Sequence, residues 1–331
     1  EGRGGRPKPP RMAEMASRQV ESKGEESPFS PFSSYGDSSR YKVLRCLGKG
    51  SYSSVYLARR NRSTKRANGG EDLVCIKKIY VNTIEQINSA IQEATTMCKA
   101  NHCAGVCKYY DCYIESEDSE VKQIRGNMSF CLVVELSRSL LHNPNPSLTQ
   151  FHTARNDNSN PSYVRFCEGG TLQDVIDIRK QKKLGPFAET SAMGILYEIA
   201  KTVAELHRLK ILHRDLKPSN IFLTRSGKIR IGDFGVAKDL INQRHTGTFV
   251  GTTGYIAPEV WNMRPYDNKC DVWSLGVLML EMLTLSNSSS PRELEKLRKS
   301  LDEASLSETT WKILPKLLSS IPKERPSAYR I

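Results

Sequence analysis

The spacing of apolar residues changes once along this chain of 331 residues. Between Tyr41 and Glu135, apolar side chains alternate with polar ones in short segments, as in half-buried β-strands. After residue 168, the apolar spacing becomes that of long amphipathic helices. We therefore expect an α+β fold, in which a small β-rich lobe is followed by a larger helical lobe.

The pattern also predicts the individual elements. In the first part it predicts strands over 41–50, 53–60, 72–81, 107–115 and 129–135, and a helix over 83–101. In the second part it predicts helices over 171–183 and 190–210, short strands around 211–215, 220–224 and 228–234, and a final helical stretch that starts near Asp271.

Composition excludes several classes of protein. Hydrophobic residues make up 38% of the chain and charged residues 26%, and no apolar run approaches the length of a membrane helix. The first residues are basic but have no apolar segment behind them, so we do not expect secretion. The expected location is the cytoplasm, and also the nucleus. The net charge of +13 is spread over the folded part, which favours phosphate-bearing ligands over a nucleic-acid surface.

Residues 1–40 are rich in Ser, Pro, Gly and charge and have no apolar periodicity, so we expect a disordered tail. Translation could start at Met12, at Met15 or further upstream. The densest group of cysteines is Cys98, Cys103, Cys107 and Cys112, with His102 nearby. It lacks the CxxC pairs of common zinc sites, so reduced structural thiols are the favoured interpretation.

A glycine-rich segment, LGKGSYSSV at 47–55, lies between two predicted strands. Its backbone N–H groups could lie over phosphates, although Ser53 replaces the third glycine of a GxGxxG pattern. The next strand carries VCIK and would place Lys77 on the face beneath this loop. A buried lysine needs an anionic partner, which is Glu93 of the following helix or, as the alternative, Glu85.

Three longer motifs follow in a fixed order. They are HRDLKPSN at 213–220, GDFG at 232–235 and APE at 257–259. They supply a carboxylate that can orient a hydroxyl (Asp215), a cation for a transferring phosphate (Lys217), and an amide and a second carboxylate that can hold Mg²⁺ (Asn220 and Asp233).

Together, these motifs resemble those of the eukaryotic protein kinase family over residues 41–331. The resemblance implies a bilobal fold with ATP in its cleft, an N-lobe of residues 41–135, and a C-lobe that ends in an incomplete last helix. Asp215 would be the catalytic base and Asn220 and Asp233 the Mg²⁺ ligands, with Lys217 on the phosphate. Residues that would contact ATP or support its site are Leu47, Gly48, Gly50, Val55, Cys75, Lys77, Glu93, Val134, Glu135 and Phe222.

The resemblance extends to supporting contacts. Cys75 stands where the family usually has Ala. In the C-lobe, Glu259 would pair with Arg325, and Asp271 would bond the backbone of the HRD motif.

The resemblance also indicates the substrate. Lys217, two residues after Asp215, is the pattern of serine/threonine kinases, and Thr252 resembles the threonine that bridges these two residues in them. The stretches NIFLTRSGKIRIGDFGVAKDL and TFVGT are similar to the NIMA-related (Nek) kinases. In such a kinase, Arg214 would receive a phosphate on the activation segment, for which Thr248 matches the Nek position.

The predicted hinge is interrupted. Joining FCLVVE to FCEGGTL gives an uninterrupted kinase-like segment, and residues 136–165 lie between them, so the hinge and C-lobe resume at residue 166. The insertion is either translated non-coding sequence or a natural insertion.

The sequence is compatible with three functions. The first is a serine/threonine kinase that uses ATP and Mg²⁺ on protein substrates, activated by another kinase or by autophosphorylation in trans, without a nucleic-acid or membrane partner. The second is a pseudokinase or scaffold whose ATP binding is impaired by the insertion. The third is a nucleic-acid-binding module.

Overall fold

The computed structural model describes residues 38–49, 53–61, 72–116, 128–136, 170–224, 228–234, 253–286, 291–301 and 306–331. These residues form two compact units. The first comes from the chain up to Lys99 and from Tyr109–Glu135, and the second from Ala100–Lys108 and from Leu136 onward. Nearly all of the predicted tail and of the hinge insertion lies outside the described residues, as do Gly50, Thr248 and Thr252.

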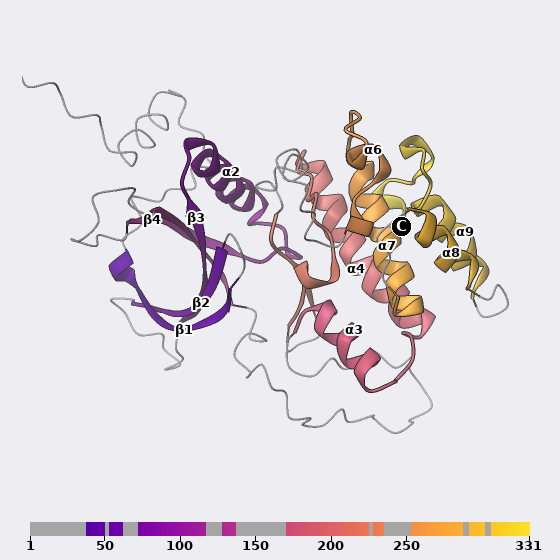
Figure 1. Cartoon of the computed structure of the whole chain (residues 1–331), viewed down its shortest axis with the longest axis horizontal. Coiled ribbons are helices and arrows are strands. Elements are labelled where there is room, and N and C mark those ends of the chain that lie inside the picture. Colours follow the sequence, from indigo (N-terminus) through magenta and orange to yellow (C-terminus); the bar gives the residue numbers. More distant parts are fainter. Residues whose placement is uncertain are drawn as a thin grey trace, which may run out of the picture. The chain divides into compact units, whose positions relative to one another are not determined.

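The first unit is an antiparallel sheet of five strands with one helix (Figure 1). The strands are β1 (Tyr41–Lys49), β2 (Ser53–Arg60), β3 (Leu73–Val81), β4 (Tyr109–Ser116) and β5 (Met128–Glu135), and the helix is α2 (Ile84–Ala100). In the sheet, the strands follow the order β1-β2-β3-β5-β4. The strands and the helix that the sequence predicts between Tyr41 and Glu135 are confirmed.

Strand alternation separates the two faces of this sheet. Val74 and Ile76 of β3 lie on one face, in a hydrophobic cluster with Ala58 of β2. The residues that alternate with them, Cys75 and Lys77, therefore lie on the opposite face.

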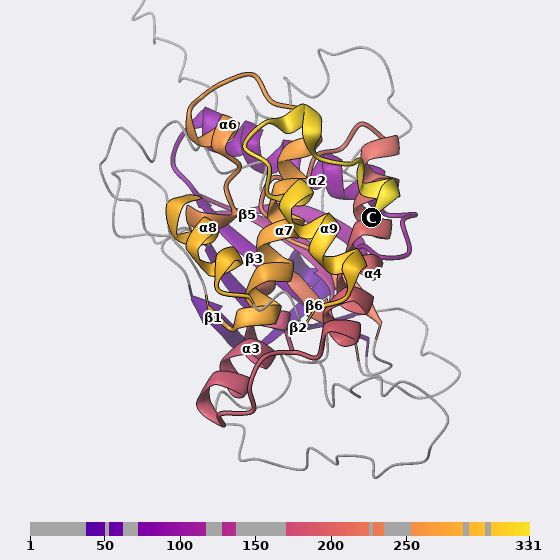
Figure 2. The same ribbon diagram turned by 90° about the vertical axis from the view of Figure 1, so that its right-hand side faces the viewer.

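The second unit is mainly helical (Figures 1 and 2). Its helices are α3 (Leu172–Gln181), α4 (Glu189–Arg208), α6 (Pro258–Trp261), α7 (Lys269–Thr284), α8 (Pro291–Lys299) and α9 (Glu308–Leu317). Short 3-10 turns are η1 (Ser38–Arg40) in the first unit and η3 (Pro218–Asn220), η5 (Thr253–Tyr255), η7 (Pro322–Glu324) and η8 (Ala328–Arg330) in the second. The α+β fold class is confirmed.

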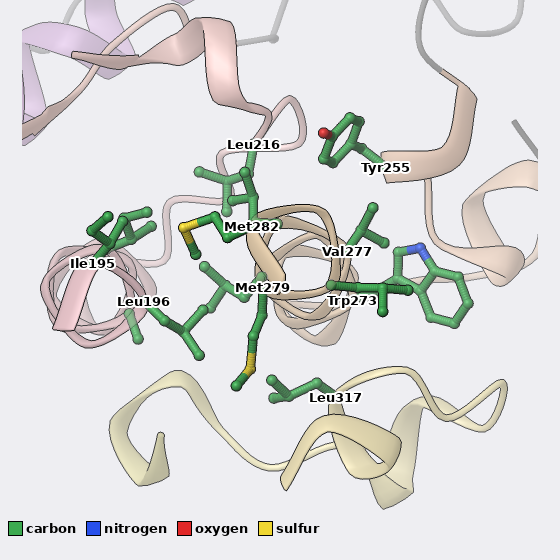
Figure 3. Close-up of a cluster of buried hydrophobic side chains, with 14 of the residues drawn as sticks. Ile195, Leu196, Leu216, Tyr255, Trp273, Val277, Met279, Met282 and Leu317 are labelled. Carbon is green, nitrogen blue, oxygen red and sulfur yellow. The ribbon is translucent and has the colours of Figure 1, made fainter. Parts of the chain in front are cut away.

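Helix α7 is the centre of the second unit. All of its residues from Cys270 to Leu283 are buried, and a helix that is buried on every side must be covered by other elements. Figure 3 shows Ile195 of α4, Leu317 of α9 and Tyr255 of η5 around this helix, all within one hydrophobic core. Figure 2 shows α8 and α9 beside α7.

One predicted strand is wrong. Residues 220–224 and 228–234 do contain paired strands, β6 (Ile221–Leu223) and β7 (Ile229–Ile231), but residues 211–215 form no strand. Their apolar pattern resembles a strand, yet the N–H groups of His213 and Arg214 donate to the carboxylate of Asp271 on α7. A side chain takes the donors that a neighbouring strand would need.

Among the described residues, no helix combines the length and the apolar character needed to cross a membrane. The same part of the chain contains no group of three or more His, Cys, Asp or Glu side chains arranged to hold a metal ion.

Candidate active site

Asp271 fixes the backbone of the segment that carries the HRD motif. Its carboxylate accepts hydrogen bonds from His213 N at 3.0 Å and from Arg214 N at 2.8 Å. The backbone bends sharply at Arg214, which has a φ of 66°, a left-handed conformation that costs energy in a non-glycine residue. The two hydrogen bonds hold this bend, as the sequence predicts for Asp271.

The charge on Asp271 is itself stabilised inside the protein. Burial alone would raise the pKa of its carboxyl, but hydrogen bonds from His207 and from the backbone of His213 and Arg214 outweigh burial, and the net pKa is lowered. His207 Nε2 lies 2.8 Å from Asp271 Oδ2. Asp271 therefore remains ionised and continues to accept these hydrogen bonds.

Three predicted catalytic residues meet directly beyond this bend. Lys217 Nζ lies 2.9 and 3.1 Å from the two carboxylate oxygens of Asp215. Asn220 Nδ2 donates to Asp215 Oδ2 at 3.0 Å and to the backbone oxygen of Asp215 at 2.7 Å. Asp215 is thus held in one orientation by a cation and an amide, and its side chain keeps 17% exposure, so its carboxylate remains accessible from solvent.

The segment that carries Asp233 is attached to the same bend through a residue that the sequence interpretation did not assign. His213 is fully buried, its Nε2 lies 3.2 Å from the oxygen of Gly232, and its ring centroid lies 5.0 Å from that of Phe234. Burial lowers the pKa of His213 despite nearby carboxylates, so the ring is neutral. The position of His213 inside the HRD motif is the sequence feature from which this role could have been predicted.

Asp233 and Asn220 fit a magnesium ion by their chemistry. Gly232 N donates to the backbone oxygen of Asn220 at 3.1 Å, which places the two segments side by side. Because Asn220 uses its side-chain nitrogen to bind Asp215, its side-chain oxygen can face a cation. A carboxylate and an amide oxygen are ligands that Mg²⁺ accepts. Asp233 has a φ of 62°, a strained conformation of the kind that occurs at functional sites.

In the first unit, Lys77 pairs with Glu93. Lys77 Nζ lies 3.0 Å from Glu93 Oε1, and the glutamate side chain is only 3% exposed. The alternative partner, Glu85, is exposed in the first turn of α2. The structure therefore selects Glu93.

The strand register places other predicted nucleotide contacts on the face that carries Lys77. Val55 pairs with both Gly48 and Lys77, and Cys75 pairs with Val134. Residues that are paired across antiparallel strands point to the same face, so these five share one surface of the sheet. Burial raises the pKa of the Cys75 thiol to about 12, which keeps it protonated and unreactive.

The other predicted contacts have less specific positions. Leu47 is partly buried in β1, and Glu135 is the last residue of β5 and pairs with Val74 on the opposite face. In the second unit, Phe222 is partly buried in β6, and its ring lies against Gly232.

The predicted pair of Glu259 and Arg325 is present in the second unit. Two nitrogens of the guanidinium lie 2.6 and 2.8 Å from the two carboxylate oxygens of Glu259. Arg325 also donates to the backbone oxygens of Ser319 at 2.8 Å and Lys269 at 2.9 Å. The pair attaches α6, which contains Pro258 and Glu259 of the APE motif, to the segment around Arg325.

Comparisons with known proteins show which proteins this chain is similar to. A model of the protein kinase domain matches residues 41–331. The serine/threonine-protein kinase Nek3 of Mus musculus is 39% identical over 125 residues, which are 38% of this chain and 24% of that protein. Nek11 of Homo sapiens is 29% identical over 304 residues, which are 88% of this chain and 39% of that protein. Nek5 of Homo sapiens is 26% identical over 298 residues, 87% of this chain and 35% of that protein. The chain thus spans about a quarter to two fifths of the length of these relatives.

Proposed function

The chain belongs to the protein kinase family, and from this premise we propose that it transfers the γ-phosphate of ATP to serine and threonine hydroxyls of proteins. The observation that carries the proposal is the contact of Lys217 and Asn220 with the carboxylate of Asp215. It provides an oriented proton acceptor beside a fixed cation, as phosphoryl transfer to a hydroxyl requires.

Each residue has a defined part in the reaction. Asp215 orients the substrate hydroxyl and accepts its proton, while Lys217 stabilises negative charge on the transferring phosphate. Asn220 and Asp233 would hold Mg²⁺, which neutralises phosphate charge when it is bound. Lys77, held by its glutamate partner on α2, would contact the α- and β-phosphates of ATP.

The choice of serine and threonine as substrates rests on Lys217. Its ammonium bonds both oxygens of Asp215, and the similarity to Nek serine/threonine kinases supports the same specificity. Thr252, which would bridge Asp215 and Lys217, lies outside the described residues.

We propose further that a phosphate on Thr248 activates the enzyme through Arg214. The Arg214 side chain is exposed, and its guanidinium carbon lies 5.7 Å from the ring centroid of Tyr266. A cation over an exposed ring gains only about 0.5–1 kcal/mol, so a phosphate that offers one to three charge-assisted hydrogen bonds would displace the ring.

The test of the catalytic proposal is the variant Asp233→Asn. It should abolish Mg²⁺-dependent phosphorylation of a Ser/Thr peptide, because the amide lacks the charge that binds the metal. Asp267 is exposed and outside the motifs, so Asp267→Asn is the matched control and should keep full activity. Near wild-type transfer by Asp233→Asn would refute the assignment. ATP-dependent thermal stabilisation, measured in parallel, separates an active kinase from a protein that does not bind ATP.

The test of the regulatory proposal is a double-mutant cycle of Thr248→Ala and Arg214→Ala. Each single variant should lower activity with little change in thermal stability, and the double variant should lose no more than either single one. Additive losses would show that the two residues act independently.

A further inference from the structure

Glu281 is a buried acid in α7 that the catalytic proposal does not use. Its side chain is 1% exposed, and one carboxylate oxygen, Oε2, accepts a hydrogen bond from the hydroxyl of Tyr255. The other oxygen, Oε1, is buried and receives no hydrogen bond from the described residues. A carboxylate with half of its acceptors unused is costly to keep ionised in the interior.

Two charged groups of α3 act on this acid from the neighbouring helix. Lys180 Nζ lies 3.9 Å from Glu281 Oε1, but the lysine side chain is 40% exposed, so solvent weakens its attraction. Asp177, one turn earlier, repels the carboxylate. Burial raises the pKa of Glu281 to about 7, Lys180 opposes the rise, and Asp177 adds to it.

Tyr255, the donor to Glu281, belongs to the segment that leads into the APE motif. Two other hydrogen bonds attach this segment to α7. Ser274 Oγ donates to the oxygen of Tyr255 at 2.9 Å, and Trp273 Nε1 donates to the oxygen of Gly254 at 3.4 Å. Neither involves an acid or a base, so of these three contacts only the one to Glu281 changes with pH near neutrality.

We propose that Tyr255, Glu281 and Lys180 form a proton-controlled anchor, which holds residues 254–257 on α7 tightly when Glu281 is ionised and loosely when it is protonated. The ionised carboxylate accepts a charge-assisted hydrogen bond from Tyr255 and attracts Lys180. The protonated acid offers only a neutral hydrogen bond, which is about half as strong, and no ion pair. The anchor does not depend on the proposed function, because its strength can be measured without kinase activity.

The anchor concerns local detachment of residues 254–257 and not unfolding of the whole unit. The neighbours of Glu281 on both sides in α7 are buried in the hydrophobic core, so detachment removes the donor Tyr255 while the acid stays inside the helices. When Glu281 is ionised, detachment would leave its carboxylate without the Tyr255 donor and without water in its place, which is unfavourable. Complete unfolding hydrates the acid, and its pH dependence therefore has the opposite sign.

Amide hydrogen exchange of the wild-type chain tests the anchor directly. After correction for intrinsic exchange rates, the amides of Tyr255 and Ile256 should be protected about fivefold more at pH 8 than at pH 6, from the difference between charge-assisted and neutral hydrogen bonds. The amides of α7 are the internal reference and should not show this gain. Equal protection at the two pH values, greater protection at pH 6, or the same change in α7 would overturn the proposal.

Variants of α3 test whether Glu281 is the group that titrates. Lys180→Met should move the midpoint of the protection change to higher pH, because the acid loses its cation, and Asp177→Asn should move it to lower pH. Both side chains are exposed, so these variants should fold. Lys201→Met, at an exposed lysine of α4, is the matched control and should leave the midpoint unchanged. Unchanged midpoints in both α3 variants, or an equal shift in the control, would exclude Glu281 as the switch.

Discussion

Removing Arg325 should destabilise the second unit far more than removing an arginine from a similar ion pair at the surface. Arg325 is 1% exposed and Glu259 is 6% exposed, and two parallel hydrogen bonds join them. Arg325→Ala leaves the carboxylate of Glu259 buried without its cation. Breaking a buried pair on one side costs about 3–5 kcal/mol.

The matched control is Arg298→Ala. Arg298 also makes two hydrogen bonds to one carboxylate, at 2.7 and 2.9 Å from the oxygens of Glu295, but that glutamate is 48% exposed. Water can replace the lost partner there, so the expected loss is about 0.5 kcal/mol. The two variants thus compare the same contact with and without burial.

Urea unfolding followed by tryptophan fluorescence measures both losses. All three tryptophans, Trp261, Trp273 and Trp311, belong to the second unit, so the signal reports on the part that contains both pairs. The double variant Arg325→Met with Glu259→Leu should recover much of the loss, because no buried charge remains.

Two results would refute this reasoning. One is a loss below about 1 kcal/mol for Arg325→Ala, which would mean that Glu259 is not left as an unpaired buried charge. The other is a double variant whose loss of stability equals the summed losses of Arg325→Met and Glu259→Leu measured singly. Losses add when two residues act independently, but not when they form a pair.

Three further predictions concern packing, pH and the insertion. Gly276→Ala should lower the free energy of unfolding by about 1–3 kcal/mol, measured by urea unfolding, because a Cβ there would lie 2.8 Å from Leu317 Cβ. In the same assay, Glu281→Gln should stabilise the chain at pH 8 by up to about 3 kcal/mol and not at pH 4. The reason is that the pKa of Glu281 is about 7 in the folded protein and ordinarily 4.5. The stabilising effect of the protonated acid is therefore complete below pH 4.5 and is lost as pH rises through 7, whereas the neutral amide of the variant does not titrate. Deleting residues 136–165 should tighten ATP binding in calorimetry, and equal or weaker binding would show that the segment belongs to the protein.

The sequence alone determined most of the elements and the chemistry that their motifs carry. Alternation and helical spacing are local properties of the chain, so the five strands of the first unit and helices α3 and α4 could be predicted from it. The residues around Asp215 could be assigned for a similar reason, because the whole HRDLKPSN motif is contiguous and its side chains meet within six residues.

Tertiary structure decided the contacts between residues that are distant in the chain. The spacing of α2 left undecided whether Glu85 or Glu93 pairs with Lys77. Only the packing of the helix on the sheet buries Glu93 beside Lys77. Residues 211–215 have the pattern of a strand, but Asp271, more than fifty positions later, takes two backbone donors of that segment. Neither outcome can be read from a local pattern.

Tertiary structure also decided which ionisable side chains are buried and how burial shifts their pKa. Glu281 lies in a mostly apolar stretch of α7, and its pKa is raised mainly by burial among the surrounding elements, with Asp177 of α3 adding to the rise. Burial and partner choice are properties of the assembled fold, since they depend on which groups exclude water from a given side chain.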